Sequence, residues 1–163
     1  MKHIGIIAAF CLAVLASCGT PKLTPEQEAE QEKVSQQVSS ALDAKQFTID
    51  VRYMNPMRAG GKPVNDSYSL TIDGDKIVSA LPYVGRGYNI PFGGGTGLNF
   101  EAEISAYNDS GFTKGCRTIT VTVDNGEDHL VYTIKVFNNG TADIHVDSRI
   151  RDSISYRGEL VLE

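Results

Sequence analysis

The stretch that decides the fold is TITVTVDNGEDHLVYTIKVFNNGTADIHV, residues 118–146. It holds three runs, 118–123, 130–137 and 142–146, in which Thr, Val, Ile and Tyr are frequent and apolar side chains recur at every second position. A period of two is typical of strands with one buried face. Asn-Gly pairs separate the runs, and this dipeptide between alternating runs is a strong hairpin signal. The stretch therefore predicts three consecutive antiparallel strands.

The same alternation extends beyond this stretch. Further strands are expected at 47–53, 68–72, 76–81 and 100–106, and around Gly158. Asp73-Gly74-Asp75 lies between two of these runs and indicates a hairpin turn, whereas residues 54–67 contain two Gly and two Pro and are expected to form a loop. The pattern predicts a mainly β domain, an antiparallel meander of seven or eight strands that is either curled as a barrel or folded as a sandwich.

A helix is expected ahead of the strands, from Pro25 to about Ala44. Thr24 is a suitable N-cap, proline is favoured at the first helical position, and Gln27 occupies the capping-box position. The rear half of this segment has one narrow apolar stripe, formed by Val34, Val38, Ala41 and Leu42. We therefore expect the rear half of the helix to dock on the β domain and the front half to face water.

The N-terminus has the pattern of a bacterial lipoprotein export signal. An apolar run at 4–15 is too short to span a membrane and fits a signal h-region. Leu15-Ala16-Ser17-Cys18 then resembles the lipoprotein box, in which small residues admit the peptidase and the thiol of Cys18 accepts the lipid. We expect three parts, which are a removed signal at 1–17, a lipidated tether at 18–24 and a single helix-plus-β domain at 25–163.

The remaining cysteines and the residues after Cys18 bear on localisation. Cys11 lies in the signal and Cys116 is the other cysteine of the mature chain, so no intrachain disulfide is expected once Cys18 carries lipid. Neither an Asp, which resembles an inner-membrane retention signal, nor an acidic cluster follows Cys18 directly. We expect an outer-membrane lipoprotein that faces the periplasm and is held by acyl chains on Cys18.

Composition excludes several classes of protein. The chain has 163 residues and a formal net charge of −5, which argues against a nucleic-acid partner because phosphate binding needs clustered Lys and Arg. The histidines of the mature chain, His129 and His145, fall on different expected strands without a cysteine at metal-ligand spacing. Neither Gly-x-Ser-x-Gly nor His-Glu-x-x-His occurs. No metal, no cofactor and no catalytic activity are therefore expected.

The segment LPYVGRGYNIPFGGGTGLNF, residues 81–100, is the first candidate for ligand binding. It combines four aromatic residues, one cation and six glycines. In the functional interpretation, a loop faces a ligand, rings stack on it and a guanidinium holds an anion or a sugar hydroxyl. In the structural interpretation, the glycines permit close backbone approach and the rings cover one end of a barrel. The candidate ligand-binding residues from this segment are Tyr83, Arg86, Tyr88 and Phe92.

A second cationic segment, residues 148–156, extends this candidate site. Arg149 and Arg151 are available to join Arg86, and Arg151 completes our set of candidate ligand-binding residues. The alternative is that both arginines pair with Asp152 or neighbouring carboxylates at the surface, where such pairs contribute about 0–1 kcal/mol.

Three motifs resemble one known family. Tyr68-Ser69-Leu70 with Asp73-Gly74-Asp75, the stretch LPYVGRGY at 81–88 and the stretch RDSISYRG at 151–158 are similar to the shared signature of a Bacteroidetes lipoprotein family, domain-of-unknown-function family 4251. The likeness extends over about residues 28–160. It implies a single fold unit, an envelope location and a gut or oral anaerobe as source, and it implies no activity.

Three functions follow from these patterns. The first is a lipid-anchored envelope protein without catalytic activity that binds a protein partner. The second is a carrier in which a curled sheet encloses a small apolar or glycan ligand, with Tyr83, Arg86 and Tyr88 at its mouth. The third is a hydrolase that uses Glu101 or Glu103, although two carboxylates on the polar face of a strand are more simply explained as solvated.

Overall fold

The computed structural model describes residues 24–88 and 97–162 of the chain. It contains one helix, α1 (Pro25–Asp43), and eight strands. The strands are β1 (Gln46–Pro56), β2 (Lys62–Asp73), β3 (Lys76–Leu81), β4 (Leu98–Thr113), β5 (Cys116–Asp124), β6 (His129–Phe137), β7 (Thr141–Ser148) and β8 (Ile154–Leu160).

Helix α1 begins with the capping box expected from the sequence. The backbone N–H of Thr24 donates to Oε1 of Gln27 at 3.0 Å, and the backbone N–H of Gln27 lies 3.4 Å from Oγ1 of Thr24. In the rear half of the helix, Val38 and Leu42 are fully buried, as the apolar stripe predicts. No helix in the described part of the chain is both long and apolar enough to cross a membrane.

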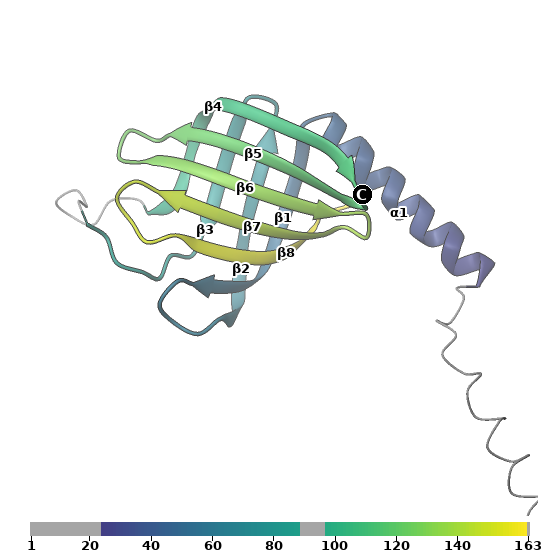
Figure 1. The fold of residues 1–163 in the computed structure, drawn as a ribbon, viewed down its shortest axis with the longest axis horizontal. Coiled ribbons are helices and arrows are strands. Elements are labelled where there is room, and N and C mark those ends of the chain that lie inside the picture. The colour runs from purple at the N-terminus through teal and green to yellow at the C-terminus, as the bar shows by residue number, and fades with distance from the viewer. Residues whose placement is uncertain (1–23, 89–96, 163) are drawn as a thin grey trace, which may run out of the picture. The chain divides into compact units, whose positions relative to one another are not determined.

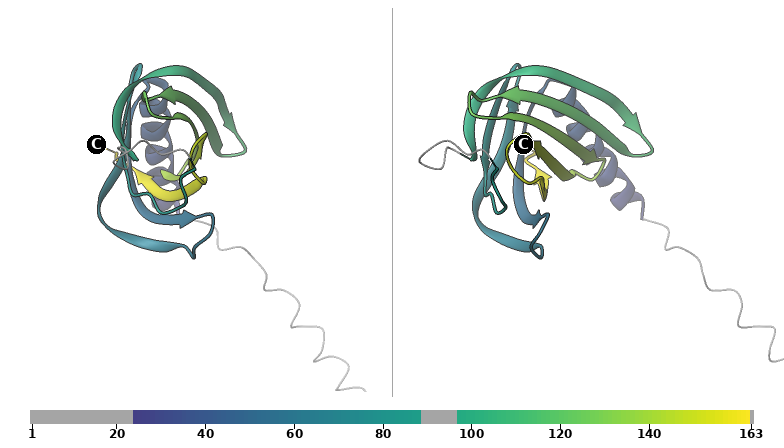
Figure 2. Two further views of the ribbon diagram at one scale, coloured as in Figure 1. Left: turned by 90° about the vertical axis from the view of Figure 1, so that its left-hand side faces the viewer. Right: turned by 60° about the vertical axis from the view of Figure 1, so that its left-hand side comes forward.

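The eight strands form a closed antiparallel barrel (Figure 1). Each strand pairs with the next one along the chain, and β8 pairs with β1 to close the sheet. The two views of Figure 2 show the sheet curling round on itself. This confirms the mainly β meander and decides between its two forms, because the strands make one barrel and not a sandwich.

Barrel closure depends on Gly158. This residue of β8 faces Val51 of β1, beside an irregularity in β1 between Val51 and Tyr53. A Cβ atom at position 158 would lie 2.1 Å from the backbone oxygen of Asp50, far inside van der Waals contact. The two strands therefore approach too closely here for any residue with a side chain.

The interior of the described barrel is packed with side chains. Strands β5 to β8 alternate between buried and partly exposed residues, which is the two-residue period seen in the sequence. Tyr132 is fully buried, and its hydroxyl donates to Oγ of Ser79 at 3.2 Å. Ser79 in turn donates to the backbone oxygen of Leu98 at 2.8 Å. Burial raises the pKa of Tyr132, so the phenol stays neutral inside the barrel.

Two expectations about element bounds were wrong. Residues 54–67 were expected to form a loop, yet β1 continues to Pro56, β2 begins at Lys62 and only 57–61 connect the two strands. Pro63 pairs with Tyr53. This part of β2 lies beyond its pairing with β3, which begins at Ser69, and proline is tolerated at such an edge. Strand β4 is also longer than the expected 100–106, because the irregularities at 104–106 and 109–112 break the two-residue period.

Candidate functional site

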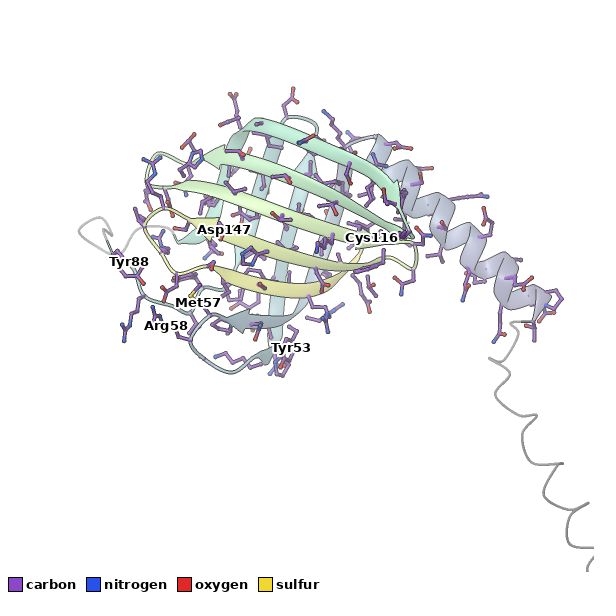
Figure 3. All side chains as sticks on the ribbon, viewed as in Figure 1. Tyr53, Met57, Arg58, Tyr88, Cys116 and Asp147 are labelled. Atoms are coloured by element: carbon purple, nitrogen blue, oxygen red, sulfur yellow. The ribbon has the colours of Figure 1, made fainter. Side chains whose placement is uncertain are left out.

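Four connections between strands lie at one end of the barrel. We call this end of the barrel the loop end. They are residues 57–61 between β1 and β2, the described parts of 82–97 between β3 and β4, 125–128 between β5 and β6, and 149–153 between β7 and β8. Figure 3 shows Met57, Arg58 and Tyr88 at this end, while Cys116 lies near the opposite end, beside α1. Because loops carry most binding residues in proteins, the loop end is the natural place for a functional site.

The carboxylate of Asp152 links three of these connections. Its Oδ1 accepts a hydrogen bond of 2.6 Å from the hydroxyl of Tyr88. Its Oδ2 accepts bonds from Nε of Arg58 at 3.0 Å and from the backbone N–H of Arg86 at 3.2 Å. The Asp152 side chain is only 5% exposed. The hydrogen bond from Tyr88, with those from Arg86 and Arg58, lowers the pKa of Asp152, so this carboxylate stays charged and holds the loops together.

Backbone contacts reinforce this link. The backbone N–H of Tyr88 donates to the oxygen of Ile150 at 2.7 Å, and that of Asp152 donates to the oxygen of Arg86 at 2.9 Å. The Tyr83 hydroxyl lies 3.0 Å from the backbone oxygens of both Arg86 and Asp152. It would be 2.4 Å from a Cβ atom at Gly85, so any side chain at position 85 would displace the Tyr83 ring from these contacts. Segments 85–88 and 150–152 therefore run side by side as a small ladder outside the barrel.

Arg151 lies beneath this ladder with its guanidinium almost fully buried. Its side chain is 2% exposed and stands 5.9 Å from the centre of the Tyr83 ring. Its Nη1 lies 3.6 Å from Oδ2 of Asp128, too far for a hydrogen bond. Neither Nη1 nor Nη2 reaches a hydrogen-bond acceptor in the structure of the described residues. Asp128 accepts bonds instead from the Ser148 hydroxyl and the backbone N–H of Arg149.

The outer surface of the loop end combines exposed apolar and cationic side chains. Met57 and Tyr88 are 62% and 60% exposed, and Val84 is also exposed. Arg58 and Arg86, in the same two connections, are exposed as well. We call these five residues the loop-end platform. Since the carboxylate of Asp152 is buried beneath it, the charges that the platform presents to solvent are two guanidinium groups.

The structure brings together four of the candidate residues chosen from the sequence. Tyr83, Arg86, Tyr88 and Arg151 all lie at the loop end, within one hydrogen-bonded unit around Asp152. Of the alternative, pairing with Asp152 or neighbouring carboxylates at the surface, one part holds for Arg151, because its guanidinium lies next to a neighbouring carboxylate, that of Asp128. The surface location was wrong, since both side chains of this pair are buried. The remaining candidates, Phe92 for ligand binding and Cys18 for the expected lipid attachment, lie outside the described residues.

Sequence reasoning missed Met57, Arg58 and Asp128 as parts of this end. Met57 and Arg58 stood in a segment noted only for its glycines and prolines. Asp128 follows the Asn125-Gly126 turn and carried no signal of burial. The one available signal was the close succession of charged residues at 149–152, which marked a place where opposite charges meet.

The other sequence candidates lie apart from the loop end. Glu101 and Glu103 are exposed on β4, and Glu101 makes a 3.5 Å contact with Lys76, so both are solvated side chains as expected. In the described residues, no group of three or more His, Cys, Asp or Glu side chains is placed to hold a metal ion. Cys116 is a free, partly buried thiol at the first residue of β5.

Comparison with known proteins agrees with the resemblance seen in the sequence. The model of the family described as "Domain of unknown function (DUF4251)" matches residues 28–160. A crystal structure of a DUF4251 family protein from Bacteroides eggerthii is similar to this chain, with a TM-score of 0.63 and 13% sequence identity. The similarity covers 83% of this chain and 92% of the other, and it shows a shared fold. No curated protein matches the sequence.

Proposed function

This chain belongs to the DUF4251 family, and from that premise we propose that it is an envelope protein whose loop-end platform binds a protein partner. The observation that carries the proposal is the Asp152 carboxylate, which fixes three connections with hydrogen bonds of 2.6 to 3.2 Å. A surface whose side chains are held before binding loses less conformational freedom when a partner docks.

The composition of the platform supports a protein as the partner. Tyr, Met and Arg are enriched at protein interfaces, and Tyr and Arg dominate their binding energy. The platform contains Tyr88, Met57, Arg58 and Arg86, with Val84 beside them. Its exposed charges are cationic, so we propose a partner that presents acidic side chains next to apolar ones.

The proposed location rests on the sequence of the N-terminus. The lipoprotein-box residues Leu15 to Cys18 support lipid attachment at Cys18, and acyl chains add about 0.8 kcal/mol of membrane affinity per buried methylene. The tether at 19–24 reaches about 20 Å at roughly 3.3–3.6 Å per residue. We propose attachment to the outer membrane on its periplasmic side, which places the β domain near partners in the same membrane.

Site-specific photocrosslinking tests the proposed platform. A photoreactive phenylalanine analogue replaces Tyr88 in the full chain, expressed in the bacterium that carries it, and crosslinked products are identified by mass spectrometry. We expect one protein to be captured from position 88. The matched control is the same analogue at Val78, an exposed apolar position on β3 away from the loop end. Absence of a product at 88, or the same products from 78, would contradict the proposal.

A second function, carriage of an anionic small molecule, is favoured by one observation. The buried guanidinium of Arg151 has two nitrogen atoms without acceptors, and an unpaired buried charge is costly. An anionic group between Arg151 and the loops would supply those acceptors. Because side chains fill the described interior, only the head of such a ligand would reach Arg151.

Native mass spectrometry distinguishes the two functions. The carrier function predicts an extra mass on the full chain isolated from its own bacterium, released by denaturation and absent from an Arg151→Gln variant that still melts cooperatively. A bare protein mass, together with a crosslinked partner at position 88, would leave binding of a protein as the function.

A further inference from the structure

A groove of about 630 Å³ runs along the outer wall of the barrel across β1, β8, β7 and β6, and none of the residues that line it belongs to the loop-end platform. Tyr53 forms one side of it and is 41% exposed. The polar side chains in its lining include those of Asn55, Lys135, His145, Ser155 and Arg157. Its volume falls in the range of small-molecule sites, about 300–1,000 Å³.

Strand register places a serine beside a histidine in this groove. His145 of β7 and Ser155 of β8 are direct cross-strand partners. Nδ1 of His145 lies 2.8 Å from Oγ of Ser155. Nε2 of the same ring lies 3.2 Å from Oδ1 of Asp147, two residues further along β7 on the same face. A carboxylate, an imidazole and a hydroxyl are thus joined in series.

The hydrogen-bond partners define the tautomer of His145. A carboxylate only accepts hydrogen bonds, so the neutral tautomer of His145 that fits Asp147 carries its proton on Nε2 and donates it to that carboxylate. Nδ1 is then unprotonated and accepts the hydroxyl proton of Ser155. The series has the order of an activated nucleophile, in which the base lies about 2.6–3.2 Å from the nucleophile and is oriented by a third group. The two ring nitrogens are exchanged relative to the serine-protease triad, where Nε2 faces the serine.

The other described histidine lacks this arrangement. His129 has Nδ1 2.8 Å from Oδ1 of Asp124, at the start of β6, and no serine or threonine hydroxyl is bonded to its ring in the described structure. The contrast shows that a carboxylate beside a surface histidine does not by itself bring a nucleophile into place. At His145 the pairing of β7 with β8 adds the serine.

Groups that stabilise negative charge stand next to Ser155. Asn55 of β1 is its cross-strand partner on the other side and lines the groove with a side-chain amide. Arg157 and Lys135 add positive charge to the same lining, although Nε of Arg157 is bonded to Asp143 at 3.0 Å. Amide and cationic side chains are among the groups that stabilise an oxyanion.

From this geometry we propose that the groove hydrolyses carboxylic esters, with Ser155 as nucleophile, His145 as general base and Asp147 as the residue that positions His145. Oγ of Ser155 forms a bond to the acyl carbon while its proton passes to Nδ1 of His145. The bond from the acyl carbon to the alcohol oxygen breaks, and the alcohol leaves with the proton from His145. Water then attacks the acyl-serine with His145 as base, which releases the acid and restores the Ser155 hydroxyl.

Tyr53 gives the groove a preference among esters. Tyr53 is the cross-strand partner of Arg157, and its exposed ring offers an apolar surface within the same groove as Ser155. Esters with an apolar group next to the scissile bond, flanked by a polar group that Arg157 or Lys135 holds, therefore fit the site best.

A fluorophosphonate probe tests the proposal on the full chain. Attack by Ser155 forms an O–P bond, breaks the P–F bond and releases fluoride, and the adduct is found by intact mass and peptide mapping. We expect one adduct per chain, on Ser155, and none in Ser155→Ala. The rate of labelling should fall at least about 100-fold in His145→Gln and by a smaller factor in Asp147→Asn.

The matched control is His129→Gln, which removes the other carboxylate-bonded histidine and should label Ser155 at the unchanged rate. Circular dichroism and melting confirm that each variant is folded. An unlabelled Ser155, an adduct spread over several serines, or equal labelling in folded His145→Gln would overturn the proposal. Loss of crosslinking at position 88 would leave it unaffected, because the platform and the groove share no residue.

Discussion

Nη1 of Arg117, on β5, lies 2.6 Å from Oδ1 of Asp43, the last residue of α1. The same guanidinium donates from Nε and Nη2 to the carboxylate of Asp109 on β4. Arg117 is buried, and its hydrogen bonds with Asp109 raise its pKa, so it stays charged throughout the physiological range. The buried guanidinium of Arg117 thus connects the end of α1 to β5 and to the irregular part of β4.

Replacing Arg117 should therefore destabilise the domain more than replacing an exposed arginine. Arg117→Ala leaves the partly buried carboxylate of Asp109 without its partner, and we expect a loss of about 2–3 kcal/mol in the free energy of unfolding. Urea unfolding followed by circular dichroism measures it. Arg52→Ala is the control, because Arg52 and Asp50 form an exposed pair worth about 0–1 kcal/mol. Equal losses in the two variants would show that Arg117 contributes no more than a surface pair.

The stability of the domain should fall in acid because of two carboxylates. Hydrogen bonds from Arg117 lower the pKa of Asp109 below its usual 3.8, and those led by Tyr88 lower that of Asp152. The unfolded chain then binds protons at a higher pH than the folded one. The stabilisation is present in full above the unfolded pKa and is lost as the pH falls through the folded values. Urea unfolding from about pH 6 down to about pH 2 measures the slope.

An Asp152→Asn variant checks the assignment. The amide does not titrate, so the acid dependence of unfolding should be weaker than in the parent chain. Asp66→Asn, an exposed carboxylate on β2, should leave the slope unchanged. A slope identical in all three proteins would exclude Asp152 as a source of the acid sensitivity.

Much of the fold follows from sequence because its signals are local. The alternating runs at 118–146 and their Asn-Gly pairs are each complete within a few residues, and β5, β6 and β7 form where they predict. The closure of the sheet was left open between barrel and sandwich, since it depends on β1 meeting β8 across about a hundred residues. The outward-facing start of β2 at Lys62 was missed because its exposed side chains show no apolar period.

Closure at Gly158 can be tested directly. Gly158→Ala places a methyl group against the backbone oxygen of Asp50, and the clash is with backbone that cannot move without opening the β1–β8 pair. We expect a loss of more than about 3 kcal/mol, or failure to fold. Thermal melting and soluble yield provide the measurement.

Gly60→Ala serves as its control. Gly60 lies in the connection between β1 and β2, and an added Cβ atom would meet nothing within 4 Å. Its melting temperature should stay close to that of the parent chain. If Gly158→Ala melted at the same temperature, the close approach of β8 to Asp50 would not be needed for closure.

The order of the loop end should depend on Asp152. Asp152→Ala removes the acceptor for Arg58, Tyr88 and the backbone N–H of Arg86, so the segment 85–88 should open more often. Limited trypsin digestion should cut after Arg58 and Arg86 about tenfold faster. Asp124→Ala, at the exposed end of β5, is the control and should leave these rates unchanged. Unaltered cleavage in Asp152→Ala would mean that the backbone ladder alone holds the segment.

The candidate sites were predictable in part. The aromatic and cationic stretches at 81–88 and 148–156 pointed to Tyr83, Arg86, Tyr88 and Arg151, which do meet. His145, Asp147 and Ser155 were not grouped, because their meeting depends on the register of β7 against β8. That register joins residues on either side of the connection at 149–153, for which the sequence shows no turn motif.

The sequential pairing of the strands also bears on how the chain is made. Seven of the eight pairings join consecutive strands and are complete once the second strand has emerged, whereas β1 waits for β8, the last to be synthesised. Until then β1 has an open edge along which another chain can add. While the chain is still incomplete, this unpaired edge is therefore a point at which it is exposed to aggregation.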